Sequence, residues 1–250
     1  MKAQSKLTTV TDGRRRIISD PPLIEPIEDI ASDEQASDLY DLLREVLGKY
    51  RRTLQSDRRH LLDYFTMVQV ARKVVGVGSV GTRCWIVLME GADSTEPLFL
   101  QPKQAEASVL ARYCGRSQYA NQGERVVAGQ RLMQAESDIF LGWARATGLD
   151  GVHRDFYARQ LKDWKMSAPI EQMVPAGMTI YARMCAWTLA RAHACSGDRI
   201  ALAAYLGGSG KFDQAIADFA ETYADQNERD YTALQAAVKD GKAEATTEIY

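Results

Sequence analysis

A glycine-rich segment between two strand patterns constrains the fold of this chain more than any other feature. Residues 76–81, Gly-Val-Gly-Ser-Val-Gly, match the pattern G-x-G-x-x-G. The segment before them, Met67–Val75, begins with period-two alternation, and the segment after them, Cys84–Met89, is short and rich in β-branched and aromatic residues. Both patterns predict β-strands. A dinucleotide-binding turn leads into a helix whose N-terminus holds the pyrophosphate, so the strand after Gly81 disfavours a dinucleotide-binding fold.

The order strand, glycine loop, strand occurs in protein kinases, where the loop folds over the nucleotide phosphates. Glycines let the backbone approach closely and point N–H groups at phosphate oxygens. A kinase also needs a lysine on the next strand and a carboxylate on the following helix to orient it. Lys103 ends the next predicted strand, Leu98–Lys103, and Glu106 and Glu124 lie on the predicted helices that follow. A purely structural glycine hairpin is the alternative.

The remaining patterns predict an α+β protein. Thr8–Thr11 and Arg14–Ile18 flank an Asp-Gly pair and predict a hairpin. Further elements are expected as helices at Ser32–Leu54, Ala105–Tyr113 and Gly123–Gln134, as strands at Phe140–Trp143 and Phe156–Leu161, and as a buried helix at Met178–Cys195. We expect an N-terminal extension (1–31), a helical segment (32–66), a kinase-like nucleotide-binding lobe with an antiparallel sheet of about five strands and a helix (67–166), and a mostly helical lobe (167–250).

Composition excludes several classes of function. The net charge is −2 with both signs mixed, so bulk electrostatics predict no nucleic-acid partner. The four cysteines form no C-x-x-C pair and are interpreted as reduced, buried thiols, and the three histidines show no metal-ligand spacing. No apolar run is long enough to span a membrane, and the N-terminus has no hydrophobic signal core. We therefore expect a cytoplasmic protein without a structural metal.

The catalytic half of a kinase site has no counterpart in the sequence. His153-Arg154-Asp155 carries the letters of a kinase catalytic loop, but the metal-binding asparagine five residues later is replaced by Gln160. The triplet also comes directly before a predicted strand, so we interpret it as a chance match. No Asp-Phe-Gly occurs in the chain. We predict no catalytic residue and no metal ligand within these 250 residues.

Several long segments resemble a bacterial family of unassigned function, domain of unknown function 2252. They are VARKVVGVGSVGTRCWIVLMEG, PLFLQPKQAEASVL, GERVVAGQRLMQAESDIFLGW, DFYARQLKDWK, LARAHACSGD and FDQAIADFAETYADQNERDY. The family is similar to the protein-kinase-like superfamily in a circularly permuted order, with the catalytic and metal-binding motifs upstream of the glycine loop. The resemblance implies that this chain corresponds to the C-terminal half.

The resemblance also implies a site for ATP with Mg²⁺. Its residues would be Gly76, Gly78, Ser79, Gly81, Thr82, Arg83 and Lys103, with Glu106 or Glu124 orienting the lysine. Two departures concern the lysine: the family has an acidic residue after it where this chain has Gln104, and Pro102 precedes it. Proline removes a ladder donor from a strand and suits only an edge or a bulge.

Two functions from different classes follow from the sequence. The first is a half-site for ATP whose catalytic aspartate and asparagine come from a separate upstream chain. The second is a non-catalytic protein-interaction module, or a degenerate fragment, with a purely structural glycine hairpin. A further expectation is self-association through exposed helical surface that the missing half would cover, at Ser32–Phe65 and Met178–Val238.

Overall fold

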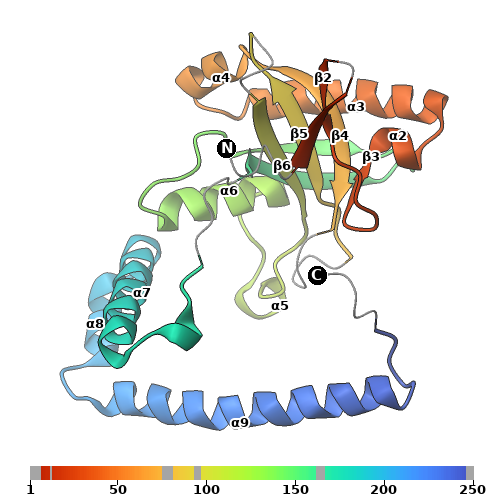
Figure 1. Cartoon of the computed structure of the whole chain (residues 1–250). Helices are drawn as coiled ribbons and strands as arrows, with labels where there is room; N and C mark the ends of the chain where they lie inside the picture. Colours follow the sequence, from red (N-terminus) through yellow and green to blue (C-terminus); the bar gives the residue numbers. More distant parts are fainter. Residues whose placement is uncertain (1–6, 12, 75–80, 93–96, 162–166, 246–250) are drawn as a thin grey trace. The chain divides into compact units, whose positions relative to one another are not determined.

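The centre of the fold is a six-stranded antiparallel sheet with the strand order β3-β4-β5-β6-β8-β7 (Figure 1). Its strands are β3 Ile24–Pro26, β4 Thr66–Lys73, β5 Trp85–Glu90, β6 Pro97–Ala105, β7 Gly142–Thr147 and β8 His153–Gln160. The predicted N-terminal hairpin forms a separate pair, β1 Thr8–Thr11 and β2 Arg14–Ile17. The computed structural model describes residues 7–11, 13–74, 81–92, 97–161 and 167–245.

Helices follow and interrupt the strands, so the predicted α+β class is confirmed. They are α2 Ile27–Ile30, α3 Asp33–Arg51, α4 Ser56–Leu62, α5 Ala111–Cys114, α6 Gln122–Met133, a 3-10 turn at Ile170–Gln172, α7 Pro175–Ser196, α8 Arg199–Leu206 and α9 Lys211–Lys239. The chain divides into two compact units, residues 1–192 and 193–250. The sheet has one strand more than the predicted region, because β3 from the N-terminal extension pairs with β4.

Helix α3 covers one face of the sheet (Figure 1). It begins at a capping box, in which Ser32 Oγ accepts from the Gln35 N–H and the Gln35 side chain accepts from the Ser32 N–H. Its apolar stripe packs over a core that includes Val87 and Leu100 from β5 and β6. Near its C-terminus, the Trp143 N–H donates to Thr53 Oγ1 at 3.0 Å, which joins the end of this helical segment to β7.

The opposite face of the sheet is shared by the β1–β2 hairpin and α6. Ile17 of β2 packs with Ile86, Leu88 and Phe99 in a second core. The buried Gln69 side chain holds the hairpin in place, since its Oε1 accepts from the Ile17 N–H at 2.7 Å. A strand's successive side chains point to opposite faces, which is why this core and the one beneath α3 use alternate residues of the same strands.

Helix α6 is fixed to the sheet at its N-terminus. The carboxylate of Asp155, on β8, accepts from the Gln122 N–H at 2.7 Å, while Asn121 Oδ1 caps the helix by accepting from the Glu124 N–H at 3.0 Å. Arg131 lies over the ring of Trp143 on β7, with 5.9 Å between its guanidinium carbon and the ring centroid. Helix α6 therefore covers the face to which Asp155 and Trp143 point.

Three local predictions were wrong. Ala105–Tyr113 is not a helix, because β6 continues to Ala105 and only Ala111–Cys114 is helical. Of the four cysteines, Cys84 alone is buried and the other three are exposed, all four being free thiols. The helix α7 has no buried residue, whereas Met178–Cys195 was predicted to be buried; Trp187 is 67% exposed. Alanine-rich composition permits burial but does not provide a packing partner. None of the described helices has the length and apolar character that crossing a membrane requires.

Candidate functional site

Lys103 lies on β6 at the point where the sheet meets the end of the glycine-containing connection. It pairs with Tyr157 of β8 on one side and forms an isolated bridge with Cys84 on the other. Asp155 and Tyr157 are two apart on β8 and therefore share a face. Because register places Lys103 opposite Tyr157, the Lys103 side chain points to the face that α6 covers.

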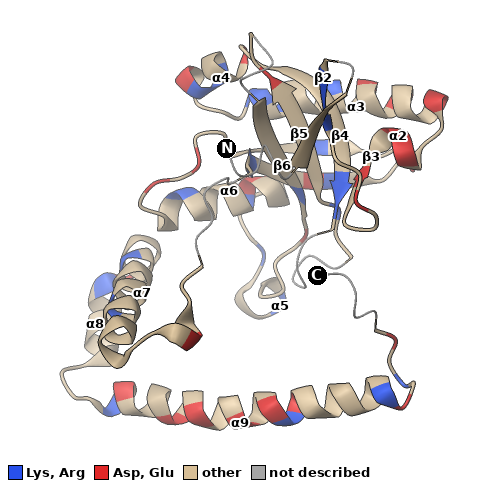
Figure 2. Cartoon of the chain, viewed as in Figure 1, with Lys and Arg blue, Asp and Glu red and all other residues tan. Residues whose placement is uncertain are grey.

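Three cations on this face act electrostatically on the Cys84 thiol: Lys103, Lys73 at the end of β4, and Arg159 on β8. Burial raises the pKa of the Cys84 thiol, and the positive charges of Lys103, Lys73 and Arg159 act in the opposite direction. Strand pairing places them near one another: the Lys73 N–H donates to the Cys84 carbonyl at 2.9 Å, Cys84 bridges Lys103, and Lys103 pairs with Tyr157, two residues before Arg159. Figure 2 shows the basic residues at the end of β4. We call Lys73, Lys103 and Arg159 the basic cluster.

The basic cluster is half-buried and suited to an anion. The Arg159 Nε atom is buried and has no hydrogen-bond partner in the part of the chain that the structure describes. Within the same residues, Lys103 makes no ion pair with a carboxylate. A buried donor without a partner is rare in folded proteins, and several partly desolvated cations attract an anion more strongly than exposed ones do. Phosphate oxygens would supply the missing acceptor.

The predicted loop residues divide into two groups. Gly76, Gly78 and Ser79 lie outside the described residues. Gly81 is described and has φ of +80°, a left-handed conformation that favours glycine.

Thr82 and Arg83 follow Gly81 and lead into the bridge at Cys84. Arg83 turns to the opposite face from Lys103, where one of its Nη atoms lies 3.7 Å from an Asp150 carboxylate oxygen. The structure thus separates the side chain of Arg83 from the basic cluster.

The two candidate glutamates make other contacts. Glu106 accepts from the Gln104 side chain at 3.0 Å, and its carbonyl accepts from Arg125. Glu124 stands in the first turn of α6, where its charge complements the helix dipole. Neither makes an ion pair with Lys103 among the described contacts. Gln104, the departure from the family pattern, accepts from the Arg83 N–H at 3.3 Å and so helps to close the connection before β5.

The His153-Arg154-Asp155 triplet is part of strand β8 and does not form a loop, which agrees with its interpretation as a chance match. Asp155 has a structural position: it is 9% exposed and accepts from Arg145 Nε at 2.6 Å and Nη2 at 3.1 Å. Burial alone would raise the pKa of Asp155, but the hydrogen bonds from Arg145 and the Gln122 N–H outweigh it and hold the pKa below the ordinary value. Among the described residues, no group of three or more His, Cys, Asp or Glu side chains could hold a metal ion.

Sequence reasoning found Lys103 but missed Lys73 and Arg159. The signal that could have found them is the alternation of side chains along a strand. Residues 101, 103 and 105 share one face of their strand, and residues 155, 157 and 159 share one face of theirs. Combining them requires the register between β6 and β8, which pairs strands whose sequences are separated by α6.

Together these features define a class: an α+β protein whose antiparallel sheet carries a half-buried basic face next to a glycine-containing hairpin connection. The chain belongs to the bacterial family described as "uncharacterized protein conserved in bacteria" (DUF2252), which it matches over residues 1–237. No curated protein and no solved structure matches it.

Proposed function

We propose that the basic cluster binds the phosphate groups of a nucleoside triphosphate such as ATP, in the small lobe of a kinase-like phosphotransferase. The observation that carries the proposal is the strand register that places Lys73, Lys103 and Arg159 on one face of neighbouring strands, with the Arg159 Nε buried and unpartnered among the described residues. This lobe corresponds to residues 67–166.

The order of the parts along the chain supports the proposal. In a kinase, the glycine-rich loop precedes a lysine on the third strand, and the helix with the orienting glutamate follows that strand. Here β4 and β5 are antiparallel neighbours joined by the glycine-containing connection, Lys103 stands on β6, and α6 comes next. The lysine and α6 also occupy the same face of the sheet.

Each group has a role that follows from its chemistry. Backbone N–H groups at Gly78–Gly81 would approach the phosphates, while Lys103 and its two neighbouring cations would neutralise their charge. Bound ATP would supply the phosphoryl group, and Mg²⁺ would need carboxylates and an asparagine. We place these groups outside the described residues and assign only nucleotide binding to the described residues.

Replacing Lys103 with alanine is expected to weaken Mg-ATP binding about 10- to 100-fold, because one charge-assisted contact contributes about 1.5–3 kcal/mol. Arg159→Ala should have a similar effect. Isothermal titration calorimetry on the whole chain measures both. Adenosine should bind the wild type and both variants equally, since it has no phosphate.

Lys49→Ala is the matched control, because Lys49 is an exposed lysine of α3 that pairs with Glu45 at 2.7 Å. It should leave ATP binding unchanged. Undetectable ATP binding by the wild type, or equal binding by the wild type and Lys103→Ala, would contradict the proposal.

A second function, a protein-interaction module, is favoured by the exposed apolar side chains of α9. Ile216, Phe219 and Tyr223 recur at intervals of three and four residues, which places them on one face of the helix, and they are 51%, 62% and 60% exposed. Charged residues of both signs occupy other positions of α9 (Figure 2). We infer that this face associates with another chain, the simplest candidate being a second copy.

The whole chain is accordingly expected to be an oligomer. Size-exclusion chromatography with light scattering should give a mass that is a multiple of 27.8 kDa. Combining Phe219→Glu with Tyr223→Glu should shift the mass to that of one chain, because two charges cannot be buried without partners. Glu228→Gln, elsewhere on α9, is the control and should not change the mass. A wild-type mass of 27.8 kDa would count against this function.

A further inference from the structure

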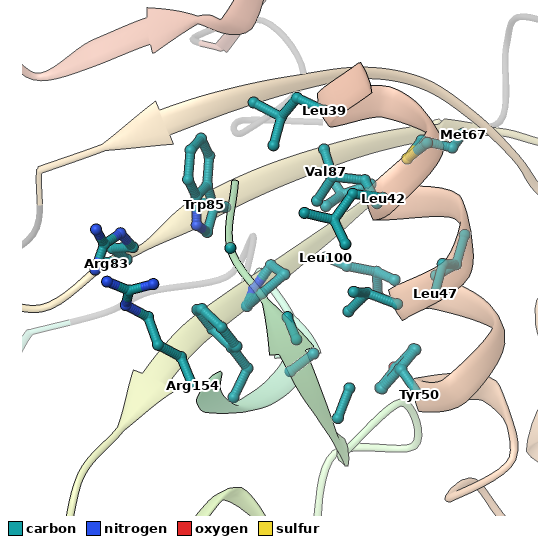
Figure 3. A pocket seen from close by; sticks show the side chains of 18 of the residues that line it. Leu39, Leu42, Leu47, Tyr50, Met67, Arg83, Trp85, Val87, Leu100 and Arg154 are labelled. Atoms are coloured by element: carbon teal, nitrogen blue, oxygen red, sulfur yellow. The ribbon is translucent and has the colours of Figure 1, made fainter. Parts of the chain in front are cut away.

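A cavity lies on the face of the sheet opposite the basic cluster, between the sheet and α3 (Figure 3). Its volume is about 330 Å³, and nearly all of its walls are apolar. Pro102 lines the cavity, whereas the next residue, Lys103, belongs to the basic cluster on the opposite face. The sheet therefore separates the two sites. Small-ligand pockets span roughly 300–1,000 Å³, which places this cavity at the lower end of that range.

The cavity lies along the apolar stripe of α3 that faces the sheet. Leu39, Leu42, Val46 and Leu47 form the apolar stripe of α3 that faces the sheet, yet each remains only half-buried. Protein interiors are normally close-packed, with few voids larger than a water molecule. An apolar stripe left half-buried over a cavity indicates space for an apolar ligand.

Charged side chains gather at one end of the cavity. Figure 3 shows Arg83 and Arg154 side by side there, whereas the other labelled side chains, among them Trp85, Leu39 and Leu100, are mostly apolar. Arg154 donates to both carboxylate oxygens of Asp150, at 2.8 and 2.6 Å, and Arg83 lies 3.7 Å from the same carboxylate. Hydrogen bonds from Arg154 and the Val152 N–H hold the pKa of Asp150 well below its ordinary value. Two guanidinium groups therefore share one carboxylate, leaving an excess of one positive charge.

The turn that carries this group is shaped to bring its side chains close to the backbone. A Cβ atom at Gly148 would lie 2.5 Å from Asp150 Oδ1 and 2.8 Å from Arg154 Nη1. The absence of a side chain at Gly148 thus permits the Arg154–Asp150 pair to fold over the turn between β7 and β8. The charged end of the cavity is a built feature of this turn.

We propose that the cavity binds a medium-chain aliphatic carboxylic acid. The aliphatic tail occupies the space between α3 and the sheet, and the carboxylate lies at Arg83 and Arg154. The single excess charge matches a monoanion, and a guanidinium group presents a fork of donors that fits a carboxylate. An extended peptide is disfavoured, because the cavity walls are the side of a helix and the face of a sheet, whose backbone groups are already hydrogen-bonded within those elements.

Octanoate and 1-octanol test the proposal by calorimetry on the whole chain. Octanoate should bind with one-to-one stoichiometry and 1-octanol about tenfold more weakly, because it lacks the charge-assisted contact. Arg83→Gln should lower octanoate affinity by about tenfold and leave octanol affinity unchanged. Arg83 is exposed, so this variant should fold, which a thermal melt verifies.

Ala146→Leu tests the apolar part of the cavity independently of the charge, since Ala146 lines the cavity and a larger side chain would fill it. It should abolish binding of both ligands. Arg44→Gln is the control, because Arg44 is exposed on α3 and pairs with Asp41 instead. The proposal would be overturned by the absence of saturable octanoate binding, by equal affinities for octanoate and octanol, or by octanoate binding that neither Arg83→Gln nor Ala146→Leu alters. Binding of a leucine-rich peptide without octanoate binding would likewise overturn it, in favour of protein docking.

Discussion

Replacing Gly123 with alanine is expected to lower the free energy of unfolding by about 2–3 kcal/mol, the range for overpacking a well-packed site. A Cβ atom at this position would lie 2.1 Å from the carbonyl oxygen of Phe156 and 2.6 Å from its carbonyl carbon. Both atoms belong to the backbone of β8, which pairs with β6 and β7 and cannot yield as a flexible side chain could. Urea denaturation followed by circular dichroism measures the change.

Helix α6 cannot relieve the clash by moving outward without losing its anchors. The Gln122 N–H donates to Asp155, and the Asn121 side chain caps the first turn. A shift of α6 would break the bond from Gln122 to Asp155 and disturb the packing of α6 on β6 and β8, the strands that carry Lys103 and Arg159. Gly123→Ala should therefore weaken ATP binding as well as stability, if the cluster is the phosphate site that we propose.

Gly129 in the same helix provides a matched control. A Cβ atom there would meet only the Met133 methyl group, at 3.7 Å, which is an ordinary contact. Glycine in a helix interior is less favourable than alanine by up to about 1 kcal/mol, so Gly129→Ala should stabilise the chain. Opposite signs for the two substitutions are expected; destabilisation of similar size by both would show that helix propensity, not the contact with β8, governs α6.

Local periodicity was sufficient to predict most of the sheet. The alternating segment before the glycines became β4, the β-branched and aromatic segment after them became β5, and the Asp-Gly hairpin formed between residues that flank it directly. Each of these elements depends on neighbours within a few residues. Ser32, which begins the predicted helix, is also only three residues from its capping partner Gln35.

Long-range pairing could not be predicted in the same way. β3 joins the sheet through pairing of Ile24 with Lys73, 49 positions later, and no local pattern specifies that contact. The basic cluster depends on the same kind of information, because Lys73 and Arg159 lie on strands at opposite ends of the predicted lobe and only strand pairing brings them to the same face as Lys103. The sequence identified Lys103 by comparison with the order of elements in a kinase. The register of the strands was needed to find its neighbours Lys73 and Arg159.

The cavity beneath α3 was also invisible to pattern reasoning. The apolar stripe of α3 predicts a face that is buried, whether it packs against the sheet or leaves space for a ligand. Burial of each residue distinguishes the two cases, and it depends on how far the helix stands from the sheet. Arg83 shows the same limit, because its position after the glycines suggested the phosphate side whereas its side chain lies with Asp150 on the other face.

Replacing Asp155 with asparagine is expected to lower the free energy of unfolding by about 2–3 kcal/mol at neutral pH, since hydrogen bonds to a charged group contribute about 1.5–3 kcal/mol and one partner is left buried. Asp155 is 9% exposed and accepts from Arg145 and from the Gln122 N–H. Asparagine keeps the shape of the side chain but loses the negative charge. Arg145 is half-exposed, which keeps the effect below that of a fully buried ion pair.

The effect should depend on pH in a definite direction. The pKa of Asp155 is lower in the folded chain than its ordinary value, so the folded state favours the charged carboxylate. The stabilisation is complete above the unfolded pKa, about 3.9, and is lost as the pH falls through the lower folded pKa. The difference between the wild type and Asp155→Asn should therefore be constant from about pH 5 to 8 and shrink below about pH 4.

Asp41→Asn is the matched control, because Asp41 forms an exposed ion pair with Arg44 on α3. Exposed pairs contribute about 0–1 kcal/mol, so this variant should unfold nearly as the wild type does at every pH. A difference between wild type and Asp155→Asn that persists undiminished to pH 2 would show that the charge of Asp155 is not what stabilises the junction. The asparagine amide would then be destabilising by its geometry, and the anchoring of α6 would rest on Asn121 and on packing instead.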